Sequence, residues 1–223
     1  MSAPADLLQR IGQLEQRLAT LEDIEAIRRL QYTYGYYIDL RLWDEMAALF
    51  VDQGASIEIG QRGRYEGREA IRSFLLEVLG QGRAGLNRNE FINHMQLQGV
   101  ISVDPDGLHA QGRFRALIQG SPPQGGSTLL LAEGVYENTY VKQGGQWRIA
   151  RLWWVPTFYV RLPGYDSVAF DSGPASAALP PQAASAPVCE ALGRRFPPFH
   201  YRHPATGAEV RDVSSAQHPM NQG

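Results

Sequence analysis

The sequence predicts an α+β fold in which a curved, cone-shaped antiparallel sheet wraps around N-terminal helices. Three observations favour this class. Apolar residues recur every three or four positions over the first forty residues, as in an amphipathic helix. Four long runs of alternating apolar and polar residues follow between residues 93 and 160, as in strands. Helices first and a meander of strands afterwards are typical of α+β domains.

The chain opens with an amphipathic helix. Its apolar positions are Leu7, Ile11, Leu14, Leu18 and Leu21, and the register then shifts to Ile24, Ile27, Leu30 and Tyr34. Such a helix has more apolar surface than one small core needs. We therefore expect its first half either to pack on a neighbouring subunit or to cover its own domain.

The remaining elements follow from local patterns. The alternation in "ASIEIG" predicts a strand, and "GRYEG" turns the chain into a second helix, Arg68 to Leu79, which ends at Gly80. Turn sequences rich in Gly, Pro and Asp then separate four strand candidates: "NHMQLQGVISVD", "LHAQGRFRALIQG", "STLLLAEGVYENTYV" and "QWRIARLWWVPTFYV".

The sequence divides into two regions. Residues 1–162 form the predicted α+β domain, and residues 163–223 form an extended tail rich in Pro and Ala, in which 172–188 is a low-complexity connector. The aromatic "FPPFHYRHP" segment of the tail is expected to dock on its own domain or on a neighbouring subunit.

Composition limits the partners. The formal net charge is −2 and no basic stripe is present, so we expect neither nucleic acid nor a membrane surface as a partner, but a small molecule. We see no secretory signal or membrane-spanning run, which predicts a cytoplasmic protein. Cys189 is the single cysteine, so an internal disulfide is excluded, and its Ala/Pro-rich surroundings argue against a nucleophile.

Several stretches resemble the SnoaL-like, nuclear-transport-factor-2-like families. They are "LEDIEAIRRLQYTYGYYIDLRLWDEMAALF", "GRYEGREAIRSFL", "NHMQLQGVISVD" and "GGQWRIARLWW". Within these families the chain is most similar to the cofactor-independent dehydratases, bile-acid 7α-dehydratase and scytalone dehydratase. The resemblance spans roughly residues 10–160 and implies a cone with one deep pocket. It specifies the substrate poorly, because this fold hosts enzymes and non-enzymes alike.

The resemblance implies a catalytic group of Tyr34, Asp39 and His94. Burying the carboxylate of Asp39 is costly unless a partner satisfies it, and His94 is the obvious partner. Tyr34 and Asp39 lie five residues apart, about 140° around an ideal helix, so they share a pocket only if the helix bends or the cavity is wide. The alternative is that Asp39 caps the next helix, near Trp43, and that His94 is structural.

The chain also departs from those families. Ile118 stands where the dehydratases carry a further carboxylate or histidine, and Glu58 stands where they carry a pocket tyrosine. We expect Glu58 to be a base, an orienting group or an ion-pair partner of Arg64 or Arg68.

Strand alternation predicts the pocket lining. On the inward faces we place Phe114, Ile118, Tyr136, Asn138 and Trp154, together with Ala110, Gly112, Ala116, Gly134, Tyr140, Leu152 and Pro156. Arg113 and Arg115 then point the other way and are rejected as catalytic residues. An aromatic lining with few polar groups suits a flat aromatic or polycyclic ligand.

No motif predicts a metal or a coenzyme. His200, His203 and His218 lie in a Pro-rich tail without a carboxylate set, and no phosphate-binding loop or G-x-S-x-G elbow is present. The predicted function is a cofactor-independent lyase that performs acid-base elimination. The sharpest expectation is a lignin-derived phenolic diarylpropane that releases formaldehyde to give a stilbene. The alternatives are a hydroxysteroid-type dehydratase, an isomerase or hydratase, or a non-catalytic binding module, in each case as a homo-oligomer (dimer or trimer).

Overall fold

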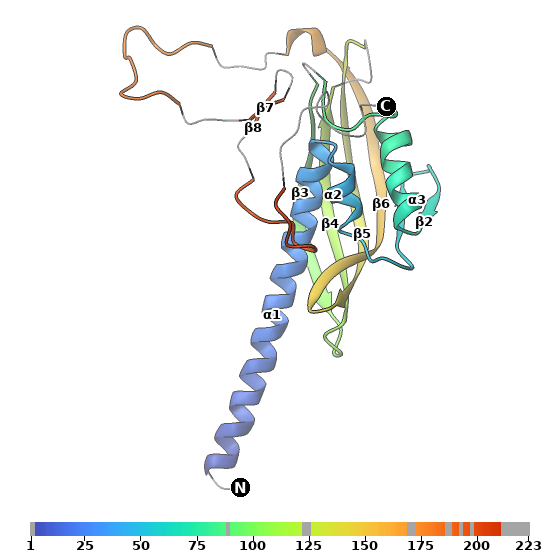
Figure 1. Cartoon of the computed structure of the whole chain (residues 1–223), viewed down its shortest axis with the longest axis vertical. Coiled ribbons are helices and arrows are strands. Elements are labelled where there is room, and N and C mark those ends of the chain that lie inside the picture. The colour runs from blue at the N-terminus through green and yellow to red at the C-terminus, as the bar shows by residue number, and fades with distance from the viewer. Residues whose placement is uncertain are drawn as a thin grey trace.

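A six-stranded sheet in the order β2-β1-β6-β5-β4-β3 forms one layer of the fold, and helices cover one of its faces (Figure 1). The computed structural model describes residues 3–87, 90–121, 126–168, 173–185, 189–191, 194–196 and 199–210. The sheet strands are β1 (Ser56–Ile59), β2 (Arg64–Glu66), β3 (Ile92–Val103), β4 (His109–Gly120), β5 (Thr128–Gln143) and β6 (Gln146–Pro163). The other elements are α1 (Ala3–Asp39), α2 (Trp43–Ala47), α3 (Arg68–Ser73), η1 (Phe74–Leu79), η2 (Tyr165–Ser167), β7 (Cys189–Ala191) and β8 (Arg194–Phe196).

The sheet is mixed rather than fully antiparallel. Neighbours from β3 to β6 pair antiparallel as predicted, but β1 lies parallel to β6, with Ile57 opposite Leu152. A parallel pair needs a long crossover connection, and the elements between β1 and β6 supply it. The edge strand β2 pairs antiparallel with β1.

The core lies between the sheet and the second half of α1. The alternation predicted for β4 is confirmed, because Ala110, Gly112, Phe114, Ala116 and Ile118 are buried. Phe114 packs on Gly99 of β3, where a Cβ atom would overlap the aromatic ring. The β3–β4 register shifts between Gln96 and Gly99, so β3 bends at this point.

The first half of α1 does not cover its own domain. Residues 4–22 are all exposed and project away from the sheet, whereas the helix packs on the fold from Asp23 onward (Figure 1). No helix among the described residues is both long enough and apolar enough to cross a membrane.

The second predicted helix is present with the expected bounds. Its first six residues form α3, and the chain continues as the π-helical segment η1 as far as Leu79. The Gly80 N–H donates to the carbonyl of Leu75 at 2.8 Å, which is the five-residue spacing of a π-helix.

Residues 199–210 of the tail dock on their own domain. The Phe199 and His203 rings pack against Tyr37 of α1, at centroid distances of 5.9 and 5.5 Å. Arg148 of β6 donates to the carbonyl of Ala205 at 2.9 Å. Within the predicted connector 172–188, the described residues 173–185 are exposed.

Candidate active site

An acid and an imidazole from distant parts of the chain meet at the inner face of the sheet. Oδ1 of Asp39 accepts the backbone N–H of His94 at 2.6 Å and lies 3.2 Å from Nδ1 of the imidazole ring. The His94 side chain is 7% exposed and that of Asp39 is 15% exposed. The structure thus brings together two of the predicted catalytic residues, in a mostly buried environment.

The end of α1 fixes the position of the acid. Asp39 is the last residue of the helix, and Arg41 adopts a left-handed conformation with φ of 55°. The Leu42 N–H donates to Tyr37 (2.9 Å) and the Arg41 N–H to Ile38 (3.2 Å), which is the hydrogen-bond pattern of a Schellman motif. The carboxylate of Asp39 is therefore presented where the helix stops.

An ion pair ties this helix end to the strand that carries the histidine. Nη2 of Arg41 lies 2.5 Å from Oε1 of Glu90, which precedes β3, and both side chains are nearly buried. Burial lowers the pKa of Arg41, and the charge of Glu90 opposes that shift. The pair holds α1 and β3 together beside the contact between Asp39 and His94.

Two buried tyrosine hydroxyl groups, one from α1 and one from β5, contact each other. The Tyr34 and Tyr136 oxygens are 3.2 Å apart, and the rings meet edge to face at 5.6 Å. Burial raises the pKa of both phenols, and the charge of Asp39 further raises that of Tyr34. Both hydroxyls are protonated at neutral pH, so each can donate a hydrogen bond.

A network of amides lies on the inner side of the site, and we did not predict it. Gln31 donates to Gln96 (2.8 Å), and Gln96 donates to the carbonyl of His94 (3.2 Å). Oε1 of Gln31 accepts from Asn138 (2.9 Å) and from Tyr140 (2.8 Å). These side chains are held by one another, so Asn138, predicted as a ligand contact, here serves the network.

Further aromatic rings extend from the tyrosine pair toward solvent. Trp154 lies 6.1 Å from Tyr136 and 5.6 Å from Tyr159, between centroids. Trp154 is buried, with no hydrogen-bond partner for its indole N–H, whereas Tyr159 is half-exposed. Ile118 is buried directly opposite His94 on the neighbouring strand. These side chains lie on the inner face of the sheet, and their role as a pocket lining stays a prediction.

Glu58 does not join this group. It pairs in register with Trp153, while its neighbours Ile57 and Ile59 are buried, so its side chain lies on the opposite face of the sheet. There it approaches Arg151 at 3.9 Å, rather than the predicted partners Arg64 and Arg68. Alternation along a four-residue strand separates Glu58 from the acid and the imidazole.

Arg113 and Arg115 occupy the outer face, as predicted. Each forms an ion pair across β4 and β5, Arg113 with Glu137 and Arg115 with Glu133. Their charges are satisfied away from the site, and they have no contact with it.

The tail histidine His203 uses its ring nitrogens in hydrogen bonds within the docked segment and to α2. Nδ1 of His203 accepts the N–H groups of Ala205 and Thr206, and Nε2 donates to the carbonyl of Glu45, so both ring nitrogens are occupied. No cluster of three or more metal-ligating side chains occurs in the described part of the chain. His218 and the side chain of Cys189 lie outside that part.

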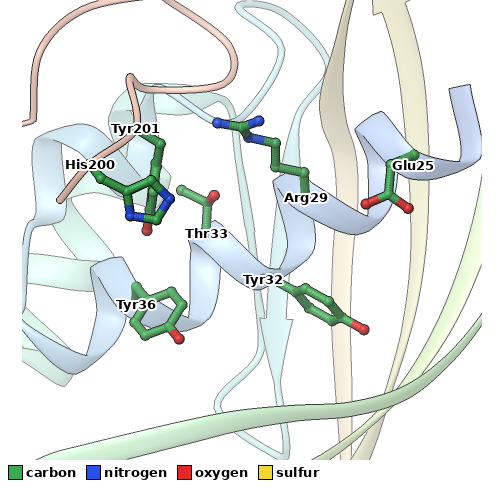
Figure 2. A pocket seen from close by; sticks show the side chains of 7 residues that line it. All are labelled: Glu25, Arg29, Tyr32, Thr33, Tyr36, His200 and Tyr201. Carbon is green, nitrogen blue, oxygen red and sulfur yellow. The ribbon is translucent and has the colours of Figure 1, made fainter. Parts of the chain in front are cut away.

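A surface pocket of about 270 Å³ lies elsewhere, between α1 and the tail. Figure 2 shows its lining: Glu25, Arg29, Tyr32, Thr33, Tyr36, His200 and Tyr201. No predicted site residue is among them. The lining residues of α1 sit largely on its solvent side, with Tyr36 58% exposed, whereas Tyr34 and Gln31 point into the core. The contact between Asp39 and His94 lies outside this pocket, so the region around His94 is the candidate active site.

Comparison with known proteins gives a family and a fold. A family model described as a SnoaL-like domain matches residues 19–152. No curated protein gave a match.

Three crystal structures share the fold. A protein provisionally named scytalone dehydratase, from Novosphingobium aromaticivorans, is 24% identical with a TM-score of 0.52. A type 2 hexachlorocyclohexane dehydrochlorinase is 22% identical (TM-score 0.58), and a type 3 enzyme from Novosphingobium barchaimii is 19% identical (TM-score 0.56). Each alignment covers 66% of this chain and 94% of the other. At these identities the similarity establishes the fold alone.

Proposed function

Because the chain belongs to the SnoaL-like domain family, we propose that it is a cofactor-independent lyase that performs acid-base elimination on a small aromatic molecule. The observation that carries the proposal is the mostly buried contact between Asp39 and His94. Similar folds include proteins named dehydratase and dehydrochlorinase, whose names denote elimination reactions. Fold alone does not decide function, so the proposal rests on the site.

His94 is the proposed base. A carboxylate oxygen only accepts hydrogen bonds, so Oδ1 of Asp39 places the ring proton on Nδ1 and leaves a lone pair on Nε2. That nitrogen takes a proton from the substrate, and the carboxylate stabilises the imidazolium that forms. The backbone contact of Asp39 with His94 keeps the acid in place through the cycle.

Tyr34 and Tyr136 are the proposed hydrogen-bond donors. Since burial raises the pKa of both, they stay protonated and release a proton poorly, but each O–H can still donate a hydrogen bond to oxygen. Tyr34 would stabilise the departing hydroxyl or a developing phenolate, and the contact between the two hydroxyls orients it. The aromatic side chains of Trp154 and Tyr159 would receive an aryl ring.

The finer proposal for the substrate is a phenolic 1,2-diarylpropane-1,3-diol derived from lignin. The substrate phenol gives up its proton, the benzylic hydroxyl takes up that proton and leaves as water, and a quinone methide forms. His94 then takes the proton of the terminal hydroxymethyl group. The carbon–carbon bond breaks, formaldehyde departs, and the electron pair restores the phenolate of a stilbene, which takes up the proton held by His94. The balance is one diol to one stilbene, one water and one formaldehyde, so neither an oxidant nor a reductant is consumed.

The test is a turnover assay on phenolic diarylpropane diols and hydroxysteroids, with formaldehyde detection and product mass. Loss of water alone indicates a dehydratase, and an unchanged mass indicates an isomerase. His94→Ala is expected to lower turnover by about 10²–10⁴-fold while ligand binding persists. A binding module would show no turnover with any of these compounds.

A matched control is available in the same sheet. His109 also contacts an aspartate, with Nδ1 2.6 Å from Oδ2 of Asp106, but this pair is exposed on a turn. His109→Ala should leave turnover unchanged. Equal activity of wild type and His94→Ala would refute the proposed role of His94.

A further inference from the structure

The first half of α1 is a helix with an apolar face that no other described residue of its own subunit covers. Residues 4–22 are exposed, and the five large apolar side chains of this face are between 42% and 64% exposed. Figure 1 shows this part of α1 extending away from the domain. Large apolar side chains gathered on one face of an isolated helix mark a site of association.

The spacing of these side chains is that of a coiled-coil seam. Leu7, Ile11, Leu14, Leu18 and Leu21 follow one another at intervals of four, three, four and three residues. This places leucine at each d position and Ile11 and Leu18 at the a positions. Leucine at d with the β-branched Ile11 at one of the two a positions favours two strands over three or four.

The domain leaves this seam open. Asp23 occupies an f position, on the side of the helix opposite the seam, and anchors α1 to the sheet. Its Oδ1 accepts from Nε1 of Trp147 (2.8 Å) and from Nζ of Lys142 (2.6 Å). The side of the helix that carries the f positions therefore faces the subunit, and the a and d side chains point away from the subunit.

Charges beside the seam select the partner and its direction. Arg10 and Arg17 occupy g positions, and Glu15 and Glu22 occupy e positions. In a parallel pair, each g residue faces the e residue five positions later on the other helix. Arg10 then meets the partner's Glu15 and Arg17 meets the partner's Glu22. An antiparallel pair would bring arginine against arginine and glutamate against glutamate.

We propose that residues 7–21 of α1 form a parallel two-stranded coiled coil with the same segment of a second copy of this chain. The seam ends at the next a and d positions, Glu25 and Arg28, which form an ion pair with each other. A seam of this length is short for a free peptide, but α1 continues into the folded domain, so the cost of helix nucleation is already met.

The first test is the mass of the full chain by sedimentation equilibrium. Replacing Leu14 and Leu18 with lysine is expected to halve the mass of the assembly, because the two copies separate at the seam. The matched control places lysine at Gln9 and Gln16, f positions on the opposite side of the same helix, and should leave the mass unchanged. An unchanged mass in the seam variant would overturn the proposal.

The second test probes the charged residues that flank the seam. Arg10→Glu with Arg17→Glu makes all four flanking positions acidic, and Glu15→Arg with Glu22→Arg makes them all basic. Each variant alone should weaken association at least about tenfold. An equimolar mixture should restore association, because opposite charges face each other again. Failure of the mixture to associate would contradict the assigned register.

The third test determines whether the two helices run parallel or antiparallel. Its variants also carry Cys189→Ser. Leu21→Cys should oxidise to a disulfide-linked dimer, because like positions lie side by side in a parallel pair. Gln16→Cys, on the opposite side of the helix, should remain monomeric on a denaturing gel. Linkage of Leu21→Cys to Leu7→Cys in preference to itself would show an antiparallel pair and overturn the proposal.

Discussion

Protonation of His203 is expected to release the docked segment of the tail. In the structure Nδ1 of His203 accepts the N–H groups of Ala205 and Thr206, both at 3.1 Å, and Nε2 donates to the carbonyl of Glu45 at 2.8 Å. The ring is thus a neutral imidazole that uses both nitrogens. A proton on Nδ1 would point at two backbone donors and abolish both of those hydrogen bonds.

The direction of the pH dependence follows from the surroundings of the ring. Burial lowers the pKa of His203 from 6.5; the contact with Glu45 opposes the shift, and Arg148 and Arg68 reinforce it. Tyr37 also packs on the ring, and it is uncharged because burial raises its pKa. A depressed pKa means that docking is fully stabilised above about pH 6.5 and weakens as the pH falls through the folded pKa.

The size of the effect comes from the lost hydrogen bonds. Each contributes about 0.5–1.5 kcal/mol, so losing the two at Nδ1 weakens docking by roughly 1–3 kcal/mol. An opening equilibrium would then shift about 5-fold to 150-fold toward the released tail, since 1.4 kcal/mol corresponds to a factor of about ten.

Hydrogen exchange of residues 199–210 measures this equilibrium directly. Protection, corrected for the intrinsic pH dependence of exchange, should fall between about pH 7.5 and about pH 5 in the wild type. His203→Phe keeps a ring against Tyr37 but cannot titrate, so its protection should be low and independent of pH. His200→Ala, a neighbour whose ring makes no such bonds in the described structure, should behave as the wild type. Equal corrected protection of the wild type at both pH values would refute the reasoning.

Two further predictions concern packing. Gly99→Ala places a methyl group in the space of the Phe114 ring and should lower the free energy of unfolding by about 1–3 kcal/mol; an unchanged urea midpoint would contradict this contact. Asp23→Ala removes the acceptor of the buried Trp147 N–H and the partner of Lys142, and should cost about 1–3 kcal/mol in the same assay. A loss below about 0.5 kcal/mol would show that α1 is anchored by other contacts.

The fold was predictable where one face of an element is buried. The alternation in β4 predicts which side chains turn inward, and Phe114 and Ile118 are buried as expected. The parallel pairing of β1 with β6 was not predictable, because strand order depends on contacts between residues nearly a hundred positions apart. Local periodicity carries no information about such pairings.

The contact between Asp39 and His94 was predictable from the family resemblance, and the need to satisfy a buried carboxylate supported it. Asp39 needs a partner, and His94 supplies it. The prediction that Glu58 faces the site was wrong, because it followed the position of Glu58 in the family pattern and not the residues on either side of it. Ile57 and Ile59 are both apolar, so the period of two already directs Glu58 outward.

The amide network was missed although a signal for it exists. Gln96 has the same strand parity as His94, and Gln31 lies three residues before Tyr34 on the same side of the helix. A polar residue at an inward-facing position predicts a hydrogen-bonded partner. Which partner it meets is decided by tertiary packing, here between α1 and the strands.

The docking of residues 199–210 has a consequence for synthesis. This segment leaves the ribosome only after every strand of the sheet has been translated. Until then, the tail does not cover Tyr37 of the nascent domain. In the finished fold Tyr37 is fully buried. A nonsense mutation at or just before codon 199 would therefore give a chain with a complete sheet and a permanently uncovered aromatic patch, the kind of surface that chaperones and proteases select.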